Sequence, residues 1–171
     1  MISRLTHIQD KIVDYNQALK RIGIWKMKMD TIVFTNGCFD ILHTGHVTYL
    51  AEAAQLGTKL VVALNTDSSV KRQGKGDDRP INSEDARAMV VAALGAVDMV
   101  VFFDSDTPIE LIKLLRPNVL VKGADYDPEE SDSSSKKYIV GSDVVRNYGG
   151  KVEAIPLVEG FSTTSIIEKL R

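Results

Sequence analysis

The sequence contains little of what extracellular, membrane or nucleic-acid-binding proteins usually need. Its 171 residues include a single cysteine, Cys38, so no disulfide can form within the chain. No apolar run is long enough for a transmembrane helix, and the N-terminus lacks the apolar core of a signal peptide. The 21 Lys and Arg residues nearly balance 23 Asp and Glu residues, so there is no overall basic field for nucleic acid. We therefore expect a cytoplasmic protein that binds neither membranes nor nucleic acids.

Two common phosphate-binding motifs are also missing. The segment Gly74-Lys75-Gly76 does not have the spacing of a Walker loop, and no Gly-x-Gly-x-x-Gly follows the first expected strand. That strand, Thr31–Phe34, is followed instead by residues 35–46, Thr-Asn-Gly-Cys-Phe-Asp-Ile-Leu-His-Thr-Gly-His, and then by a helical pattern from Val47. A loop between a strand and a helix can bring a phosphate to free backbone N–H groups at the helix N-terminus.

Two histidines in this loop, His43 and His46, suit the transfer of a nucleotidyl group. A sugar phosphate that attacks the α-phosphorus of ATP is already an anion, so the site needs charge stabilisation and in-line positioning rather than a base. Two imidazole N–H donors would stabilise the α- and β-phosphates, Gly45 would allow close backbone approach, and Lys71 would neutralise the incoming phosphate. Mg²⁺, entering with ATP, would balance the pyrophosphate.

Other functions for these side chains are possible on the sequence alone. His43 and His46 could be structural, or they could bind zinc with Cys38 and Asp40. Structural zinc sites use four closed nitrogen and sulfur ligands, and the remaining histidine, His7, lies far away in the sequence, so we expect no resident metal. A nucleophilic Cys38 is not needed for direct transfer between phosphates.

Apolar runs alternate with helical patterns along most of the chain. Besides residues 31–34, strands are expected at 59–64, 98–103, 118–123 and 152–156, and the apolar run at 59–64 is typical of a strand buried on both faces. Alternating strands and helices predict an α/β domain with a mostly parallel five-stranded sheet, covered by helices on both faces. We place this domain at residues 30–171, ending in a helix from Ile166 to Arg171 that Ser162–Ser165 would cap.

An N-terminal amphipathic helix is expected within residues 1–29, followed by a connector. Its apolar residues recur every three or four positions and are Leu5, Ile8, Ile12, Tyr15, Leu19 and Ile22. Gly23 would end it. The helix could pack on the domain or form the seam of a homodimer, because the spacing also suits a coiled coil.

Three polar segments interrupt the regular pattern. Asn65-Thr66-Asp67 ends an expected strand, where open α/β sheets bind ligands. Residues 71–80 carry four cations and two glycines and could form a phosphate-binding flap, or only a solvated loop. Residues 129–137, Glu-Glu-Ser-Asp-Ser-Ser-Ser-Lys-Lys, predict a flexible surface loop.

Two of these stretches resemble the motifs of a known superfamily. Residues 36–46 resemble the HxGH signature of the cytidylyltransferase-like nucleotidyltransferases, and residues 159–167 resemble their ISTS-type motif. Residues 30–171 are most similar to the adenylyltransferase domain of the bifunctional heptose kinase/adenylyltransferases, the ADP-heptose synthases of lipopolysaccharide precursor synthesis. That similarity rests on residues 65–67, 69–72, 79–82 and 121–126 as well.

The resemblance implies a Rossmann-like three-layer fold and a reaction. AMP would pass from ATP to D-glycero-β-D-manno-heptose 1-phosphate, giving ADP-heptose and pyrophosphate. The implied catalytic residues are His43, His46 and Lys71. Nucleotide contacts are implied for Asn36, Gly37, Cys38, Phe39, Lys122, Gly123, Ser162, Thr163, Thr164 and Ser165. Acceptor contacts are implied for Asn65, Asp67, Arg79, Asp125 and Tyr126. Arg87 lies where related transferases carry a helix arginine.

Three departures from the family pattern bear on the substrate. The kinase domain of the bifunctional enzymes is not in this sequence, so we expect a separate sugar kinase to supply the acceptor. Extra residues at Glu130–Tyr138 lie beside the loop that we expect to contact the sugar. They leave the identity of the sugar open. Leu157-Val158 stands in place of the Arg-Thr pair of glycerol-3-phosphate cytidylyltransferases. This difference weakens the case for a CTP-dependent enzyme of that kind, which stays the alternative. A non-catalytic nucleotide sensor is disfavoured because His43, His46 and Lys71 are all present.

Overall fold

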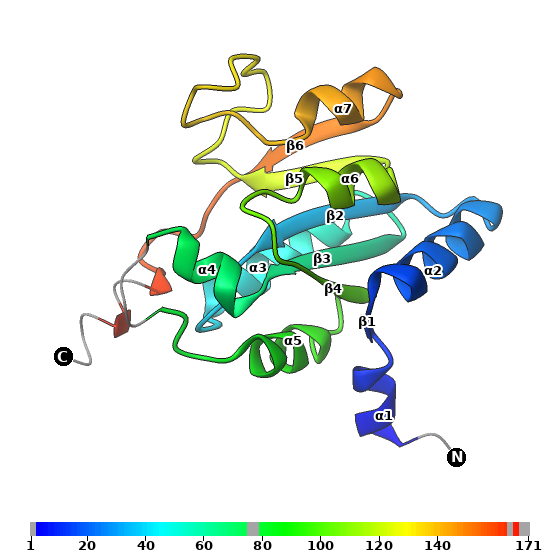
Figure 1. The fold of residues 1–171 in the computed structure, drawn as a ribbon, viewed down its shortest axis with the longest axis vertical. Coiled ribbons are helices and arrows are strands. Elements are labelled where there is room, and N and C mark those ends of the chain that lie inside the picture. The colour runs from blue at the N-terminus through cyan, green and yellow to red at the C-terminus, as the bar shows by residue number, and fades with distance from the viewer. Residues whose placement is uncertain (1–2, 75–78, 164–165, 168–171) are drawn as a thin grey trace.

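A six-stranded parallel sheet forms the centre of the molecule, and helices cover both of its faces (Figure 1). The computed structural model describes residues 3–74, 79–163 and 166–167. The strands are β1 (Ile12–Val13), β2 (Ile32–Gly37), β3 (Lys59–Asn65), β4 (Met99–Phe103), β5 (Val119–Gly123) and β6 (Lys151–Ile155). Their order across the sheet is β1-β4-β3-β2-β5-β6, and every neighbouring pair is parallel.

The direction in which the chain builds the sheet reverses between β2 and β5. From β2 the chain adds β3 and β4 on one side, then crosses to add β5 and β6 on the other. Open α/β sheets bind ligands outside the carboxyl ends of the strands at such a switch point. The loop after β2, which carries His43 and His46, begins there.

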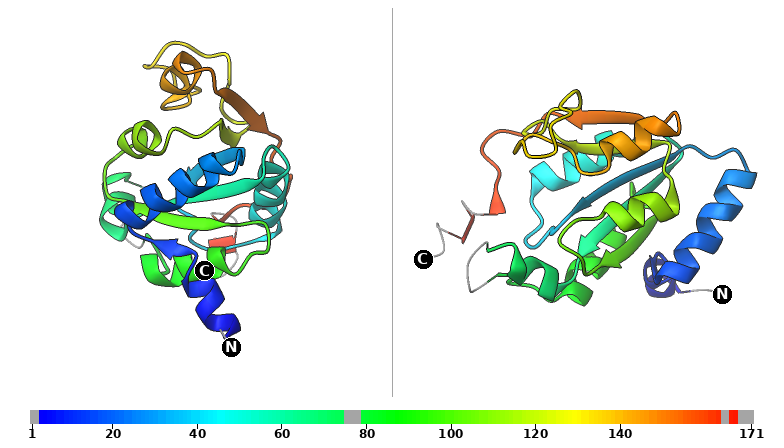
Figure 2. Two further views of the ribbon diagram at one scale, coloured as in Figure 1. Left: turned by 90° about the vertical axis from the view of Figure 1, so that its right-hand side faces the viewer. Right: turned by 45° about the horizontal axis from the view of Figure 1, so that its top comes forward.

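The two helical layers follow from the alternation of side chains along the strands. Val61 and Ala63 of β3 face the core under α2 (Tyr15–Met27), α6 (Ile109–Leu115) and α7 (Ser142–Asn147). Leu60, Val62 and Leu64 face the core under α3 (Thr44–Ala54) and α5 (Glu84–Ala92). Figure 2 shows α2, α6 and α7 on one side of the sheet. The predicted α/β fold with a parallel sheet is confirmed.

The N-terminal segment differs from the single helix that we expected. It forms α1 (Arg4–Gln9), the short strand β1 and then α2, and β1 pairs with β4 as the sixth strand. Ile8 and Ile12 pack into one core, whereas Ile22 packs into the other, so the apolar stripe divides between the two faces of the sheet. Asp14 starts a new helix with a capping box that includes Gln17.

Two further boundaries also differ from the expectation. Helix α2 continues through Gly23 to Met27, and nothing crowds that glycine. Lys71 and Arg72 belong to α4 (Asp67–Arg72) rather than to a loop. The division of the chain at residues 29 and 30 stays a prediction.

The loop between β5 and α7 has the irregular character that its composition predicted. Residues 124–141 contain neither helix nor strand, and they lie beyond the carboxyl end of β5 (Figure 1). The expected last helix lies mostly outside the described residues. Among the helices that the structure describes, none has the length and apolarity needed to cross a membrane.

Candidate active site

A pocket of about 460 Å³ opens at the carboxyl ends of β2 and β5. It is lined by residues from the loop after β2, the start of α3, the end of β5 and the segment after β6. Twelve of the predicted site residues line it: Asn36, Gly37, Cys38, Phe39, His43, His46, Lys122, Gly123, Asp125, Tyr126, Ser162 and Thr163. The motifs that lie far apart in the sequence therefore meet in one place.

The two histidine rings stack at the N-terminus of α3. Their centroids are 3.9 Å apart, with 23° between the ring planes. His43 is the N-cap of α3, and its side chain makes no capping hydrogen bond to the helix. The Nδ1 atoms of both rings are buried and have no hydrogen-bond partner within the described part of the chain. An imidazole nitrogen that carries a proton could donate to a phosphate oxygen at this position, where the helix dipole also favours negative charge.

Two glycines make room for the rings of this loop. A Cβ on Gly45 would lie 3.0 Å from Nδ1 of His43, so a larger residue would move that ring. A Cβ on Gly37 would lie 2.9 Å from the ring of Phe39. Phe39 has the left-handed φ of 49° and packs its ring 5.1 Å from that of His46. The loop thus holds its aromatic rings in one orientation.

Burial lowers the pKa of both histidines and so favours their neutral forms. Desolvation lowers the pKa of His46 to about 4, with a smaller contribution from His43 and an opposing one from a hydrogen bond to the backbone of Ile41. Desolvation also lowers the pKa of His43. A bound triphosphate would favour the protonated rings and so raise both pKa values.

The opposite wall of the pocket is formed by the end of β5 and the residues after it. Nζ of Lys122 donates to the carbonyl of Asn36 at 3.1 Å and lies 5.4 Å from the ring of Tyr126. Lys122 therefore connects the ends of β2 and β5, on either side of the switch point. Asp125 places a carboxylate on the same wall.

The segment after β6 closes the pocket with apolar side chains. Leu157, Val158 and Phe161 line it, and the ring of Phe161 lies 6.3 Å from that of His43. A Cβ on Gly123 would lie 2.9 Å from Leu157, so the glycine lets the two segments approach. The sequence motif pointed to the neighbouring Ser162–Ser165, and this apolar wall was missed. Of that motif, Thr164 and Ser165 lie outside the described residues.

A buried carboxylate fixes the loop from behind. The side chain of Asp40 is fully buried and pairs with Nε of Arg79 at 2.7 Å. It also accepts hydrogen bonds from the backbone N–H groups of Ile81 and Asn82, at 2.9 and 2.8 Å. Arg79, expected at the acceptor, thus contacts the loop that carries the histidines.

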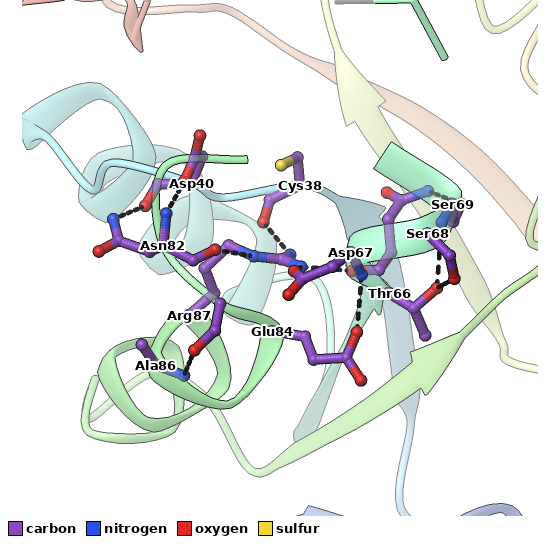
Figure 3. Close-up of polar contacts among 12 residues, drawn as sticks. Cys38, Asp40, Thr66, Asp67, Ser68, Ser69, Asn82, Glu84, Ala86 and Arg87 are labelled. Carbon is purple, nitrogen blue, oxygen red and sulfur yellow. Dashed lines mark hydrogen bonds and ion pairs between the residues drawn. The ribbon is translucent and has the colours of Figure 1, made fainter. Parts of the chain in front are cut away.

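Arg87 is buried beneath the same loop and joins three segments of the chain (Figure 3). Its guanidinium donates to the carbonyls of Cys38 and Asn65, both at 2.8 Å, and to that of Asn82 at 3.1 Å. It also pairs with the carboxylate of Asp67 at 2.8 Å. The planar fork of donors suits this role, because it can bind several oxygens in fixed directions. Arg87 therefore positions the carboxyl ends of β2 and β3.

Several predicted acceptor residues lie away from the main pocket. Lys71 is exposed on the last turn of α4 and lines neither this pocket nor its neighbour described below. Asp67 is engaged by Arg87, and Asn65 is buried, with its Nδ2 donating to Oγ of Ser69 at 2.9 Å. The roles assigned to these residues stay predictions.

Tyr49 is a pocket residue that the sequence did not reveal. It faces the pocket from α3, and its hydroxyl is 2.7 Å from Oγ1 of Thr35. Burial raises its pKa. In the sequence it reads as one apolar residue of a helical pattern, so no motif could have marked it.

Comparison with known proteins identifies the family. The cytidylyltransferase-like family matches residues 34–169. The chain is 50% identical over 161 residues to the bifunctional protein HldE of Magnetococcus marinus, across 94% of this chain and 31% of that protein. It is 56% identical over 140 residues to the bifunctional protein HldE of Syntrophotalea carbinolica, across 82% and 27%. The chain thus spans less than a third of the length of these relatives.

Solved structures agree with this assignment. A lipopolysaccharide core biosynthesis protein from Thermoplasma volcanium is 26% identical, with a TM-score of 0.57 over 75% of this chain and 97% of that one. Pantothenate synthetase from Thermus thermophilus, 13% identical with a TM-score of 0.61 over 91% and 67%, shares the fold alone. The chain belongs to the cytidylyltransferase-like family and is a nucleotidyltransferase.

Proposed function

We propose that the protein transfers AMP from ATP to D-glycero-β-D-manno-heptose 1-phosphate, releasing pyrophosphate. The observation that carries this proposal is the stacked pair His43 and His46 at the N-terminus of α3, whose buried Nδ1 atoms have no partner among residues 3–74, 79–163 and 166–167. Such groups stabilise charge that develops on phosphate oxygens during transfer. Identity of about 50% to proteins named HldE supports the choice of acceptor, together with the motifs that resemble ADP-heptose synthases.

The pocket's residues also fit the metal that accompanies ATP. Mg²⁺ binds through one or two carboxylates, substrate phosphates and several waters rather than in an all-protein cage. Asp125 supplies a carboxylate on the pocket wall, and no group of three ligating side chains gathers among the described residues. We propose that Mg²⁺ enters as the counter-ion of ATP, where it neutralises the pyrophosphate as that group leaves.

The acceptor must carry its phosphate before it reaches this site. In the proposed reaction a phosphate oxygen of the sugar 1-phosphate attacks the α-phosphorus, so an earlier reaction, which we propose is that of a kinase, has to phosphorylate the sugar. The word "bifunctional" in the names of the HldE relatives is compatible with a second activity of that kind.

Pyrophosphate release tests the proposal with four substrate pairs. ATP and CTP are each offered with heptose 1-phosphate and with glycerol 3-phosphate, and a coupled assay records pyrophosphate. We expect release with ATP and heptose 1-phosphate to exceed that of every other pair. Release only with CTP and glycerol 3-phosphate would establish the alternative enzyme. No release with any pair would favour a nucleotide-binding module without activity.

A further inference from the structure

A second cavity adjoins the main pocket across a shared wall. It has a volume of about 290 Å³, and five residues line both cavities: Asn36, Gly37, Cys38, Lys122 and Tyr126. The side away from the histidines is formed by Asn65, Gln73, Asp106, Thr107, Pro108 and Val140. A transfer between two substrates needs two sites that meet at the reacting atoms, and these cavities meet at the switch point of the sheet.

We propose that this second cavity binds the polyhydroxylated part of the acceptor, a sugar phosphate, while the main pocket binds the nucleotide. The inference rests on the proposed function and adds acceptor residues that were not expected from the sequence, Gln73, Asp106 and Thr107 among them. Of the five predicted acceptor residues, Asn65 and Tyr126 line this cavity. Lys71, predicted to neutralise the incoming phosphate, is exposed and does not line it.

The lining has the donors and acceptors that sugar hydroxyls require. Asn65, Gln73 and Thr107 supply amide and hydroxyl groups, and each can both donate and accept. Oδ1 of Asp106 accepts from Nε of Arg72 at 2.9 Å, which orients the carboxylate and leaves its second oxygen for a ligand hydroxyl. A site built to pair with several hydroxyls selects a sugar over smaller acceptors, because missing hydroxyls would leave its polar groups without partners.

An unsatisfied atom on the shared wall is a second, independent sign of a ligand. Oδ1 of Asn36 is buried and has no hydrogen-bond partner among the residues that the structure describes. A buried acceptor without a donor is unfavourable, so such an atom is most simply explained by a donor that arrives with a substrate. Because Asn36 lines both cavities, that donor would lie where the two substrates meet.

Lys122 and Tyr126 complete the shared wall. Lys122 is held there by its hydrogen bond to the carbonyl of Asn36, so a positive charge stands between the cavities. The half-buried ring of Tyr126 offers an apolar surface for the C–H face of a sugar. Val140 brings the end of the 124–141 loop to the same cavity, so this loop also shapes the acceptor site.

Steady-state kinetics with each substrate varied in turn can test the assignment. Gln73→Ala and Thr107→Val each remove one hydrogen-bonding group from the far side of the cavity. We expect each to raise KM for heptose 1-phosphate about three- to tenfold, the effect of one lost hydrogen bond, and the double variant to raise it more. KM for ATP should stay within about twofold of the wild-type value. Gln55→Ala is the matched control. Gln73 is the exposed C-cap residue of α4, and Gln55 is the exposed C-cap residue of α3 but lines neither cavity.

Two outcomes would overturn the assignment while the proposed function stands. They are an unchanged KM for heptose 1-phosphate in the double variant, and an equal rise in KM for ATP. If the wild type releases no pyrophosphate with any pair, the proposed function fails. Calorimetry of heptose 1-phosphate binding to the wild type and to the double variant then tests the sugar-phosphate site by itself. Binding that the double variant weakens would support a sugar-phosphate site, and absent or unchanged binding would reject it.

Discussion

Two loops border the active site, and different kinds of contact hold them. Residues 38–46 are fixed by buried groups from distant parts of the chain: Arg87 binds the carbonyl of Cys38, and Asp40 binds residues 79–82. The middle of the second loop, residues 127–137, is held largely by exposed bonds between near neighbours, such as those from Ser134 to Asp132, whereas Ile139 farther along is buried in the core. The loop that carries the histidines is thus anchored in the core, whereas residues 127–137 are held locally and can change at little cost to the fold.

The largest expected effect is on stability, from removing the anchor of the first loop. Arg87→Met leaves three carbonyls and the carboxylate of Asp67 without their donors, so we expect a loss of about 3–5 kcal/mol in the free energy of unfolding. Urea denaturation measures it. Arg146→Met, at an exposed position on α7, is the control and should change stability by less than about 0.5 kcal/mol. A loss below about 1 kcal/mol in Arg87→Met would mean that Arg87 does not anchor the loop.

Catalysis should depend on the imidazole rings of His43 and His46, which lie in the loop that Arg87 anchors. We expect His43→Ala and His46→Ala each to lower kcat about 10²–10³-fold, as does the loss of one donor to a transition-state anion. Circular dichroism should show the fold intact. His7→Ala, remote in α1, is the control. Near wild-type turnover in either active-site variant would remove that histidine from the mechanism.

The free energy of unfolding should decrease at acidic pH because the imidazole of His46 is buried in its neutral form. The pKa of His46 is lowered to about 4 in the folded protein, so the unfolded chain binds the proton first as pH falls below about 6.5. Stability is therefore lost between about pH 6.5 and 4, by on the order of 1–2 kcal/mol once solvent screening is allowed for. Unfolding of wild type and His46→Asn across this range measures it. Equal pH slopes in the two proteins would contradict the burial of a neutral His46.

The smallest effect is expected in the locally held loop. Asp132→Ala removes the acceptor of two bonds from Ser134, and both residues are exposed. We expect Tm to change by no more than about 2 °C, because only neighbouring residues lose contacts. A shift as large as that of Arg87→Met would abolish the difference between the two loops.

The sequence predicted the parts of the site that lie in continuous motifs. Within residues 36–46 and 122–126, the residues predicted to contact the substrates all line one pocket: Asn36, Gly37, Cys38, Phe39, His43, His46, Lys122, Gly123, Asp125 and Tyr126. The anchors could not be predicted, because Arg87 reaches Cys38 and Asn65 across 49 and 22 positions, and no local pattern records such contacts. The N-terminal helix was mistaken because a three- and four-residue apolar repeat does not say which core each residue enters. A capping box at Asp14 was the available signal that a new helix begins there.

The central claim is that His43 and His46 stabilise a single, direct displacement at the α-phosphorus of ATP. The most direct measurement follows the configuration of that phosphorus, using one stereoisomer of ATPαS with heptose 1-phosphate and ³¹P NMR of the nucleotide sugar. One displacement inverts the configuration, and we predict inversion. Retention would mean two displacements through a covalent intermediate, with Cys38 the first residue to test, and would contradict the account.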